Sequence, residues 1–274
     1  MPEAGAAASA YDEIAHLYDV DMGRNMPFDD VGLYTALAAQ AAGSVLEVGC
    51  GNGRILLELL KRGFDAYGID RSAAMLAEFL KRANRAQLGA RVCQMDVRAM
   101  AFSNAFALVL CPYSLVTYMA SQQDLARLMN GIRRALCTRG RVVIDAFIPK
   151  ANVFGGDFRL DYRRPHGDGV LTRAKRVSSL GAHLNRIERR YELVSRDGKL
   201  LQRIETSEDI RLFTPEALCE LLIASGFSID GVWWDYVSGE RLSRSRFFTV
   251  SACLAPARLI APSASRHAGR GYLT

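Results

Sequence analysis

The sequence predicts an α/β fold in which helices cover both faces of a largely parallel sheet. Between residues 44 and 149, short apolar runs alternate with amphipathic segments, which is the pattern of βαβ units. The apolar runs do not alternate strictly with polar residues, as expected for strands that are covered on both faces. A different pattern follows residue 149 and indicates an antiparallel insertion.

The expected elements can be given in chain order. Two amphipathic helices are expected at 11–19 and 28–41, before the alternation begins. Ser72 is a suitable N-cap for the helix expected at 72–85, because its hydroxyl can accept a hydrogen bond from the first turn. The remaining elements are strands at 44–48, 64–69, 91–95, 106–110 and 141–147, and helices at 54–61, 72–85 and 122–136.

The pattern changes after Pro149. Four strand-like segments at 158–164, 170–177, 183–194 and 200–211 are separated by polar turns. Asp197-Gly198 is a strong hairpin signal, because both residues tolerate the positive φ angles of a tight turn. A helix then begins at Thr214-Pro215. Two last strands are expected at 228–236 and 247–253.

We therefore expect five parts in the chain. They are an N-terminal helical lid at 1–42, a cofactor-binding core at 43–149, an antiparallel β insertion at 150–211 that serves as lid or substrate wall, the end of the core at 212–255, and a disordered tail at 256–274.

Composition excludes several classes of protein. Half of the 274 residues are hydrophobic and 23% are charged, as in ordinary globular domains. The first residues lack a signal-peptide pattern and no apolar run is long enough to span a bilayer, so we expect a cytoplasmic protein without membrane contact. The spacing of the six cysteines signals neither disulfides nor a metal site. The net charge is +6, and residues 150–211 carry 14 Lys+Arg against 9 Asp+Glu.

The most informative segment is VLEVGCGNGR, residues 45–54, in which Gly49, Gly51 and Gly53 follow an apolar strand and precede a helix. Glycines let the backbone turn tightly and approach a ligand, and the helix N-terminus presents free N–H groups. Arg54 stands where a dinucleotide fingerprint needs its third glycine, and no P-loop pattern is present. The loop therefore predicts a nucleotide-like ligand of another kind; the alternative is a tight turn without a ligand.

Two acids follow later strands. Asp70 lies 19 residues beyond Gly51, where an acid in a nucleotide-binding α/β fold accepts hydrogen bonds from ribose hydroxyls. Asp96 ends the third strand, where it can accept from an adenine amine while the backbone N–H of Val97 meets a ring nitrogen. The alternatives are a helix-terminal acid and a loop acid. Because ligands bind outside the carboxyl ends of parallel strands, the series favours one site.

These residues resemble the class I S-adenosylmethionine-dependent methyltransferases. Residues 47–53 are similar to the family's acid-x-Gly-x-Gly-x-Gly motif without mismatch, and Asp70 and Asp96 are similar to its ribose and adenine acids. Residues 136–147 and 211–227 resemble later segments of bacterial small-molecule members, and residues 11–19 their N-terminal lid. The resemblance extends over roughly residues 10–255.

The resemblance implies a Rossmann-like sheet of seven strands with the last strand antiparallel, and S-adenosylmethionine as methyl donor with S-adenosylhomocysteine as product. Arg54 is expected either to meet the cofactor carboxylate or to be a solvated helix residue. The expected cofactor site comprises Tyr18, Glu47, Gly49, Cys50, Gly51, Asn52, Gly53, Arg54, Asp70, Arg71, Met75, Asp96, Val97 and Cys111.

The chain also departs from the pattern of relatives. Ala107 stands where many relatives have Asp, and residues 110–114, LCPYS, differ from the [DN]-P-P-[YF] motif of enzymes that methylate base amines, which argues against a nucleic-acid substrate. We expect Tyr113 and His16 as catalytic candidates. The residues expected to contact the acceptor are Tyr11, Tyr18, Tyr113, Tyr118, Trp233 and Trp234.

The expected function is methylation of a small molecule, by N- or O-transfer to a heteroaromatic or phenolic secondary metabolite. Transfer from a sulfonium is an in-line displacement, so the enzyme mainly provides proximity and alignment, and a general base is not required by the sequence. Two alternatives remain open: an RNA or protein methyltransferase that docks through the basic insertion, and a non-catalytic cofactor-binding protein. We expect no metal, and a monomer or homodimer.

Overall fold

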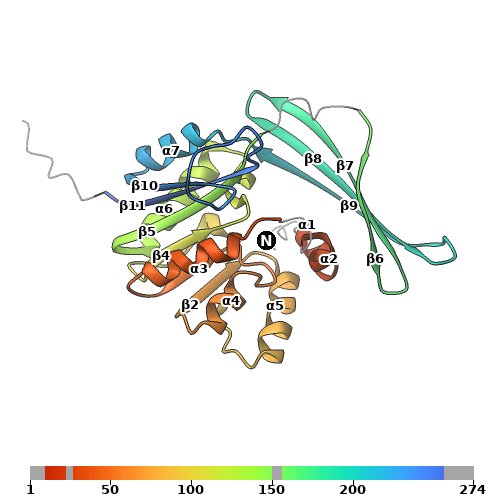
Figure 1. Ribbon diagram of the computed structural model, residues 1–274, viewed down its shortest axis with the longest axis horizontal. Coiled ribbons are helices and arrows are strands. Elements are labelled where there is room, and N and C mark those ends of the chain that lie inside the picture. The colour runs from red at the N-terminus through yellow and green to blue at the C-terminus, as the bar shows by residue number, and fades with distance from the viewer. Residues whose placement is uncertain (1–9, 23–26, 150–155, 256–274) are drawn as a thin grey trace, which may run out of the picture.

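The computed structural model describes residues 10–22, 27–149 and 156–255. It contains a seven-stranded sheet, a separate four-stranded sheet, and short N-terminal helices between the two (Figure 1). The tail expected at 256–274 lies outside the described residues. None of the described helices is long and apolar enough to cross a membrane.

The large sheet has the strand order β10-β11-β5-β4-β1-β2-β3. The pairs among β1 to β5 are parallel, whereas β11 is antiparallel to both β5 and β10. The predicted α/β sheet with its antiparallel last strand is therefore confirmed. The strands are β1 (Val45–Val48), β2 (Ala66–Asp70), β3 (Val92–Gln94), β4 (Phe106–Cys111), β5 (Leu136–Phe147), β10 (Phe227–Trp234) and β11 (Phe247–Leu254).

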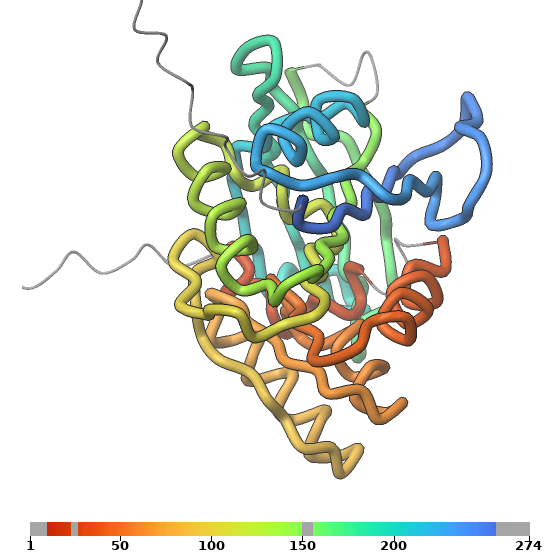
Figure 2. The backbone as a smooth tube through the Cα atoms, turned by 90° about the vertical axis from the view of Figure 1, so that its left-hand side faces the viewer, coloured from red at the N-terminus to blue at the C-terminus, as the bar shows by residue number. Residues whose placement is uncertain are grey.

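Two apolar layers hold helices against this sheet, because successive strand residues point to opposite faces. On one face, Leu46 and Val109 pack with residues of α6 (Gln122–Ala135) and α7 (Pro215–Ala224). On the other, Val45 and Leu108 pack with residues of α3 (Asp30–Gln40), α4 (Leu56–Lys61) and α5 (Ala73–Arg85). Figure 2 shows the sheet edge-on between these helices. Helices therefore cover the large sheet on both faces and hold its strands in place.

Helix termini agree with the expected caps. The Ser72 hydroxyl accepts a hydrogen bond from the N–H of Met75, and the Thr214 hydroxyl accepts one from Ala217. One boundary differs from expectation: α6 ends at Ala135 and β5 begins at Leu136, so residues 137–140, between the helix expected at 122–136 and the strand expected at 141–147, lie inside the strand as an irregularity. Arg139 has φ 64° there, which lets the chain bend without leaving the sheet.

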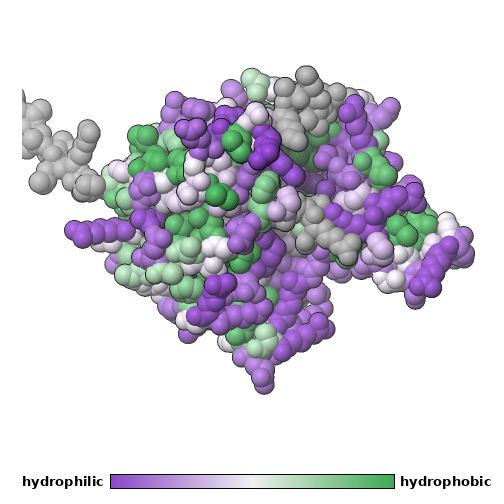
Figure 3. Space-filling view, viewed as in Figure 1, coloured by the Kyte–Doolittle hydropathy of each residue, from purple (hydrophilic) through white to green (hydrophobic). Residues whose placement is uncertain are grey.

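The insertion sheet is antiparallel, in the order β6 (Arg159–His166), β7 (Gly169–Gly181), β8 (Leu184–Ser195) and β9 (Leu200–Arg211). We call the face toward the large sheet its inner face. The opposite, outer face carries cross-strand ion pairs. In Figure 3, the surface over the insertion sheet is largely hydrophilic. These pairs are Arg176–Glu188, Arg186–Asp209, Arg190–Glu205 and Arg203–Glu192.

The N-terminal segment connects the two sheets. The helix expected at 11–19 is broken into α1 (Ala10–Ile14), the 3₁₀ turn η1 (Ala15–Leu17) and α2 (Tyr18–Met22). Ile14 and Leu17 are buried against Leu171, Tyr191 and Ile204 of the insertion sheet. On the other side, an Asp12 oxygen accepts from the Ser72 hydroxyl at 2.6 Å, and an Asp19 oxygen accepts from the Asn52 amide at 2.8 Å.

Candidate functional site

A glycine turn joins β1 to α4 at the carboxyl edge of the large sheet. Gly49, Gly51 and Gly53 have φ angles of 71°, 54° and 85°, a region that side chains rarely adopt. A Cβ at Gly49 would lie 2.0 Å from Leu115 Cδ1, and one at Gly51 would lie 2.9 Å from Met75 Cε. The turn therefore needs glycine both for its backbone and for the space above it.

Asp70 fixes this turn from the end of β2. One carboxylate oxygen accepts from the N–H of Gly51 and the other from the N–H of Ser72, each at 2.8 Å. Burial raises the pKa of Asp70 above its ordinary value, against these two hydrogen bonds. The carboxylate thus holds the glycine turn and the start of α5 together, while it also faces the adjacent cavity.

That cavity, which we call the donor cavity, has a volume of about 320 Å³. It lies over the ends of β1, β2, β3 and β4, where the sequence places a nucleotide-like ligand. Asp96, at its far end, accepts from the backbone N–H of Arg98, and the side-chain hydrogen bond from Arg98 lowers its pKa. Eleven of the residues expected at the site line the cavity: Tyr11, Tyr18, Gly49, Gly51, Asp70, Arg71, Met75, Asp96, Val97, Tyr113 and Tyr118.

Other expected cofactor residues lie behind the turn. Cys50 is 4% exposed and Cys111 is fully buried, so both act as packing residues. The Gly53 position faces Phe79, and the Asn52 amide is bound to Asp19. These side chains support the cavity and do not line it.

Arg54 has a protein partner. Its guanidinium donates to both oxygens of Asp30, at 2.8 and 2.5 Å, and Asp30 is 1% exposed. The guanidinium also lies 5.5 Å from the ring centre of Tyr113. Arg54 is therefore not the freely solvated helix residue that the sequence allowed, and its contact with a cofactor carboxylate stays a prediction.

Glu47 is buried beneath the glycine turn. Its Oε2 atom has no hydrogen-bond partner among the described residues. Burial raises its pKa to about 8, against the opposing effect of nearby Arg54. The side chain is protonated near neutral pH and does not face the donor cavity.

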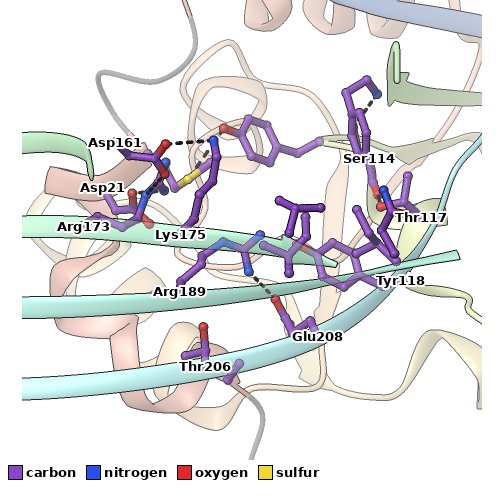
Figure 4. A pocket seen from close by; sticks show the side chains of 18 of the residues that line it. Asp21, Ser114, Thr117, Tyr118, Asp161, Arg173, Lys175, Arg189, Thr206 and Glu208 are labelled. Atoms are coloured by element: carbon purple, nitrogen blue, oxygen red, sulfur yellow. Dashed lines mark hydrogen bonds and ion pairs between the residues drawn. The ribbon is translucent and has the colours of Figure 1, made fainter. Parts of the chain in front are cut away.

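A second, larger cavity of about 500 Å³ opens from the first, and we call it the acceptor cavity. Four residues line both cavities: Tyr11, Tyr113, Tyr118 and Glu208. The far wall is the inner face of the insertion sheet, which contributes alternate residues of β7, β8 and β9. Figure 4 shows Arg189, Thr206 and Glu208 on this wall, opposite Ser114, Thr117 and Tyr118.

The opposite wall depends on a strained turn after β4. Tyr113 and Ser114 have φ angles of 59° and 58°, which cost free energy in residues with side chains. Buried Asp145 of β5 stabilises this turn by accepting from both backbone N–H groups, at 2.9 Å for Tyr113. It also accepts from the hydroxyls of Tyr34 at 2.5 Å and Tyr236 at 2.7 Å. Asp145 thus places the Tyr113 ring between the two cavities.

Tyr11, Tyr113 and Tyr118, together with Tyr18, form what we call the tyrosine cluster. The hydroxyls of Tyr11 and Tyr118 are 2.7 Å apart, and the ring of Tyr11 meets those of Tyr18 and Tyr118 edge to face at 6.1 Å. Burial raises the pKa of Tyr18, Tyr113 and Tyr118 above the ordinary value. The cluster is neutral at physiological pH and supplies aromatic surface and hydroxyls, not a base.

A buried ion-pair network ties α2 to the wall. Asp21 is 2% exposed and accepts from the hydroxyls of Tyr162 and Tyr191, each at 2.9 Å. Arg173 pairs with Asp21 and, at 3.0 Å, with Asp161. This end of the acceptor cavity therefore holds charges that are already compensated.

Three expected site residues lie elsewhere. His16 is exposed, and its Nε2 lies 3.3 Å from Gln202 Oε1, outside both cavities. Trp233 and Trp234 also lie outside both cavities, because β10 is the outermost strand of the sheet. They pack on its two faces, as alternation along a strand requires. The structure therefore places neither of these two residues, both expected to contact the acceptor, at the acceptor cavity.

Sequence reasoning missed Asp21, Asp145, Asn185, Thr206 and Glu208. Asp145 carries a signal, since it is a lone carboxylate in the apolar strand RVVIDAF. The inner-face residues carry only a weak one, because they alternate in register with Ile187, Tyr191, Ile204 and Ile210 but are themselves polar. Among the described residues, no group of three or more His, Cys, Asp or Glu side chains could hold a metal ion.

Comparison with known proteins agrees with this geometry. Residues 45–140 match the model of a methyltransferase domain family. Taken with the sheet order, the glycine turn and the acids that follow it, this match supports an S-adenosylmethionine-dependent methyltransferase whose fold is similar to that of class I members. S-adenosylmethionine is its methyl donor.

Three individual proteins show what the chain is similar to. The chain is 28% identical over 232 residues to a dTDP-3-amino-3,6-dideoxy-α-D-glucopyranose N,N-dimethyltransferase of Streptomyces fradiae, covering 83% of this chain and 88% of the relative. Its fold is similar to that of the sugar N-methyltransferase KedS8 of Streptoalloteichus, with a TM-score of 0.69, 22% identity, and 93% and 97% of the chains covered. The CcbJ methyltransferase of Streptomyces caelestis gives a TM-score of 0.76, 19% identity, and 91% and 99% coverage.

Proposed function

We propose that this methyltransferase transfers methyl groups to the amine of a small amino sugar carried on a nucleotide. The observation that carries the proposal is an acceptor cavity that has polar and charged side chains on its insertion-sheet wall and meets the donor cavity at the tyrosine cluster. Its size, about 500 Å³, is in the range of small-molecule sites. The similarity to an amino-sugar dimethyltransferase extends over most of both chains and supports the same acceptor class.

The donor side would bind S-adenosylmethionine through the turn and the strand-end acids. The fit is supported by the space above Gly51, which a Cβ would fill, and by Asp70, which lines the cavity while its oxygens hold the turn. Asp70 would accept from the ribose hydroxyls, and Asp96 with the N–H of Val97 would meet the adenine. Bound S-adenosylmethionine supplies an electrophilic methyl group on a sulfonium.

The chain's own part in transfer is alignment. The strained turn at Tyr113, held by Asp145, fixes one wall of the junction between the cavities. Residues 1–42 would act as a lid and residues 150–211 as the substrate wall, which together exclude water from the junction. Alignment of this kind provides most of the rate in a displacement whose donor is already activated.

One residue suits the nucleotide end of the acceptor. Arg246 lines the acceptor cavity and is exposed, and its guanidinium lies 5.6 Å from the ring centre of Phe28. Among the described residues, no carboxylate forms an ion pair with Arg246. A cation at an open rim is suited to a phosphate group.

A phenolic or heteroaromatic acceptor is the second candidate, because the tyrosine cluster offers aromatic faces at the junction. Docking of RNA or protein through the basic insertion is less favoured. The arginines of the outer face that would serve as contacts are paired with acids of neighbouring strands. A non-catalytic role is tested by product formation alone.

The experiment is methyl transfer followed by mass spectrometry. The purified chain is incubated with S-adenosylmethionine and dTDP-3-amino-3,6-dideoxyglucose, and in parallel with a set of phenols and N-heteroaromatics. We expect one or two methyl groups on the sugar amine, and no product with Asp70→Ala. Methylation of the aromatic set only would replace the amino sugar by the second candidate, and no product with any acceptor would favour the non-catalytic alternative.

A further inference from the structure

Three buried polar atoms on the wall of the acceptor cavity have no hydrogen-bond partner among the described residues. They are Asn185 Oδ1, Thr206 Oγ1 and Glu208 Oε1. Asn185 and Thr206 are each 7% exposed, and the Glu208 side chain is 9% exposed. Leaving a buried polar group without a partner is costly, so such atoms are rare unless a ligand or water binds them.

The three atoms belong to one patch of the sheet. The register pairs Asn185 with Ile210 and Arg189 with Thr206, so Glu208 lies on the same face between these two positions of β9. Same-face neighbours along a strand are about 7 Å apart, so the three positions extend over roughly 13 Å along the sheet. All three residues line the acceptor cavity, and Glu208 also lines the donor cavity.

The chemistry of these atoms defines what they bind. An amide oxygen and a carboxylate oxygen accept hydrogen bonds and cannot donate, while the threonine hydroxyl can do either. The other oxygen of Glu208 is held by Arg189 at 2.7 Å, which fixes the carboxylate (Figure 4). The patch therefore matches a ligand that presents several N–H and O–H groups along its length.

We propose that Asn185, Thr206 and Glu208 determine acceptor specificity, with Glu208 Oε1 accepting from the amine that is methylated and the other two binding ring hydroxyls. This inference rests on the proposed amino-sugar function. Glu208 is the positioning residue of the three, because it alone reaches the junction with the donor cavity. Asn185 and Thr206 orient the ring and so select among sugars.

The test measures binding of dTDP-3-amino-3,6-dideoxyglucose to the full chain saturated with S-adenosylhomocysteine, by calorimetry. The variants are Thr206→Val, Asn185→Leu and Glu208→Gln, each close in shape to the residue it replaces. We expect the sugar nucleotide to bind about tenfold to a hundredfold more weakly to each variant, as for the loss of a buried hydrogen bond. Affinity for S-adenosylhomocysteine should not change.

Matched controls come from the outer face of the same strand. Glu205 pairs with Arg190 and Arg203 pairs with Glu192, so Glu205→Gln and Arg203→Gln should leave sugar binding unchanged. Thr206→Val offers a second readout. Because it removes a hydroxyl that has no partner in the free chain, we expect a higher melting temperature together with weaker sugar binding. A purely structural threonine would give a lower melting temperature.

The outcomes separate this inference from the function on which it rests. If the wild type binds the sugar nucleotide and Thr206→Val, Asn185→Leu and Glu208→Gln bind it equally well, the inference is overturned while the proposed function stands. If the wild type binds S-adenosylhomocysteine but no sugar nucleotide, the proposed function fails and the inference fails with it. Weaker binding by the inner-face variants alone supports both.

Discussion

The donor cavity and the acceptor cavity meet at the tyrosine cluster but are built in different ways. The donor cavity is formed by backbone turns at the ends of parallel strands, and Asp70 within it is already hydrogen-bonded to two N–H groups. The acceptor cavity is walled by alternate side chains of antiparallel strands, and three of these keep a polar atom without a partner among the described residues. The methyl donor, which these methyltransferases share, would thus be bound mainly by backbone geometry. The acceptor, which differs among them, would be bound by side chains that can be replaced.

The largest effect on stability is expected for Asp145, because this carboxylate holds the turn that lies between the two cavities. Asp145→Ala would leave two backbone N–H groups and two tyrosine hydroxyls without their acceptor. Each buried donor without a partner costs about 1–3 kcal/mol, so we expect the free energy of unfolding in urea to fall by more than about 3 kcal/mol. Asp145→Asn, which keeps one acceptor oxygen, should lose less. Equal stability of Asp145→Ala and wild type would contradict the role given to this carboxylate.

Asp70→Ala should weaken binding in the donor cavity only. We expect the affinity for S-adenosylhomocysteine to fall about a hundredfold, because the ribose contact and the hold on the glycine turn are lost together. The control is Asp65→Ala, since Asp65 precedes the same strand but is half-exposed and pairs with Arg91. Calorimetry of both variants measures the difference. Retained donor affinity in Asp70→Ala would show that the strand-end acid is not part of the donor site.

Glu47 makes the donor side sensitive to pH. Burial raises its pKa from an ordinary value of 4.5 to about 8, so between these values the folded chain holds a proton that the unfolded chain releases. The unfolding free energy contributed by this group should therefore fall as pH rises through that window, by about 1.4 kcal/mol per pH unit.

Urea denaturation of Glu47→Gln at pH 5, 6.5 and 8 checks this sign, since the variant cannot ionise. We expect the difference in stability between variant and wild type to shift in favour of the variant with each rise in pH. A constant difference would mean that Glu47 is ionised in the folded chain.

The smallest effect is expected on the outer face of the insertion sheet. Arg190→Gln with Arg203→Gln removes two exposed ion pairs, each worth up to about 1 kcal/mol. Methyl transfer to the acceptor should stay within twofold of wild type at low and high salt. A loss of activity that grows as salt is lowered would favour docking of a nucleic acid or protein on this face.

The same contrast explains how far the sequence alone could be interpreted. The glycine turn, Asp70 and Asp96 follow their strands directly, so local order in the chain places them at one edge of the sheet. The wall of the acceptor cavity depends on the register between β8 and β9, which brings Arg189 opposite Thr206. Alternation does mark the inner face, since Ile187, Tyr191, Ile204 and Ile210 share it, but it does not show which polar residues between them lack a partner.

The tryptophans illustrate a second limit. Two aromatic residues side by side suggest a binding surface, but their distance from the site is set by strand order. Trp233 and Trp234 belong to β10, which the antiparallel strand β11 separates from the parallel part of the sheet. Asp145 shows the opposite case, because a charged residue in an apolar strand must have partners, and those partners proved to shape the site.

The division of the insertion sheet into two faces also bears on how such enzymes diverge. Cross-strand ion pairs occupy the outer positions of β7, β8 and β9, while the acceptor meets the positions between them. A mutation at an inner position that lines the acceptor cavity but belongs neither to the core with Ile14 and Leu17 nor to the network of Asp21, such as Asn185 or Thr206, leaves these pairs intact and is weakly constrained by the fold. One lineage can therefore pass from one acceptor to another through few amino-acid changes, and a library confined to inner positions is the natural starting point for directed evolution of this scaffold.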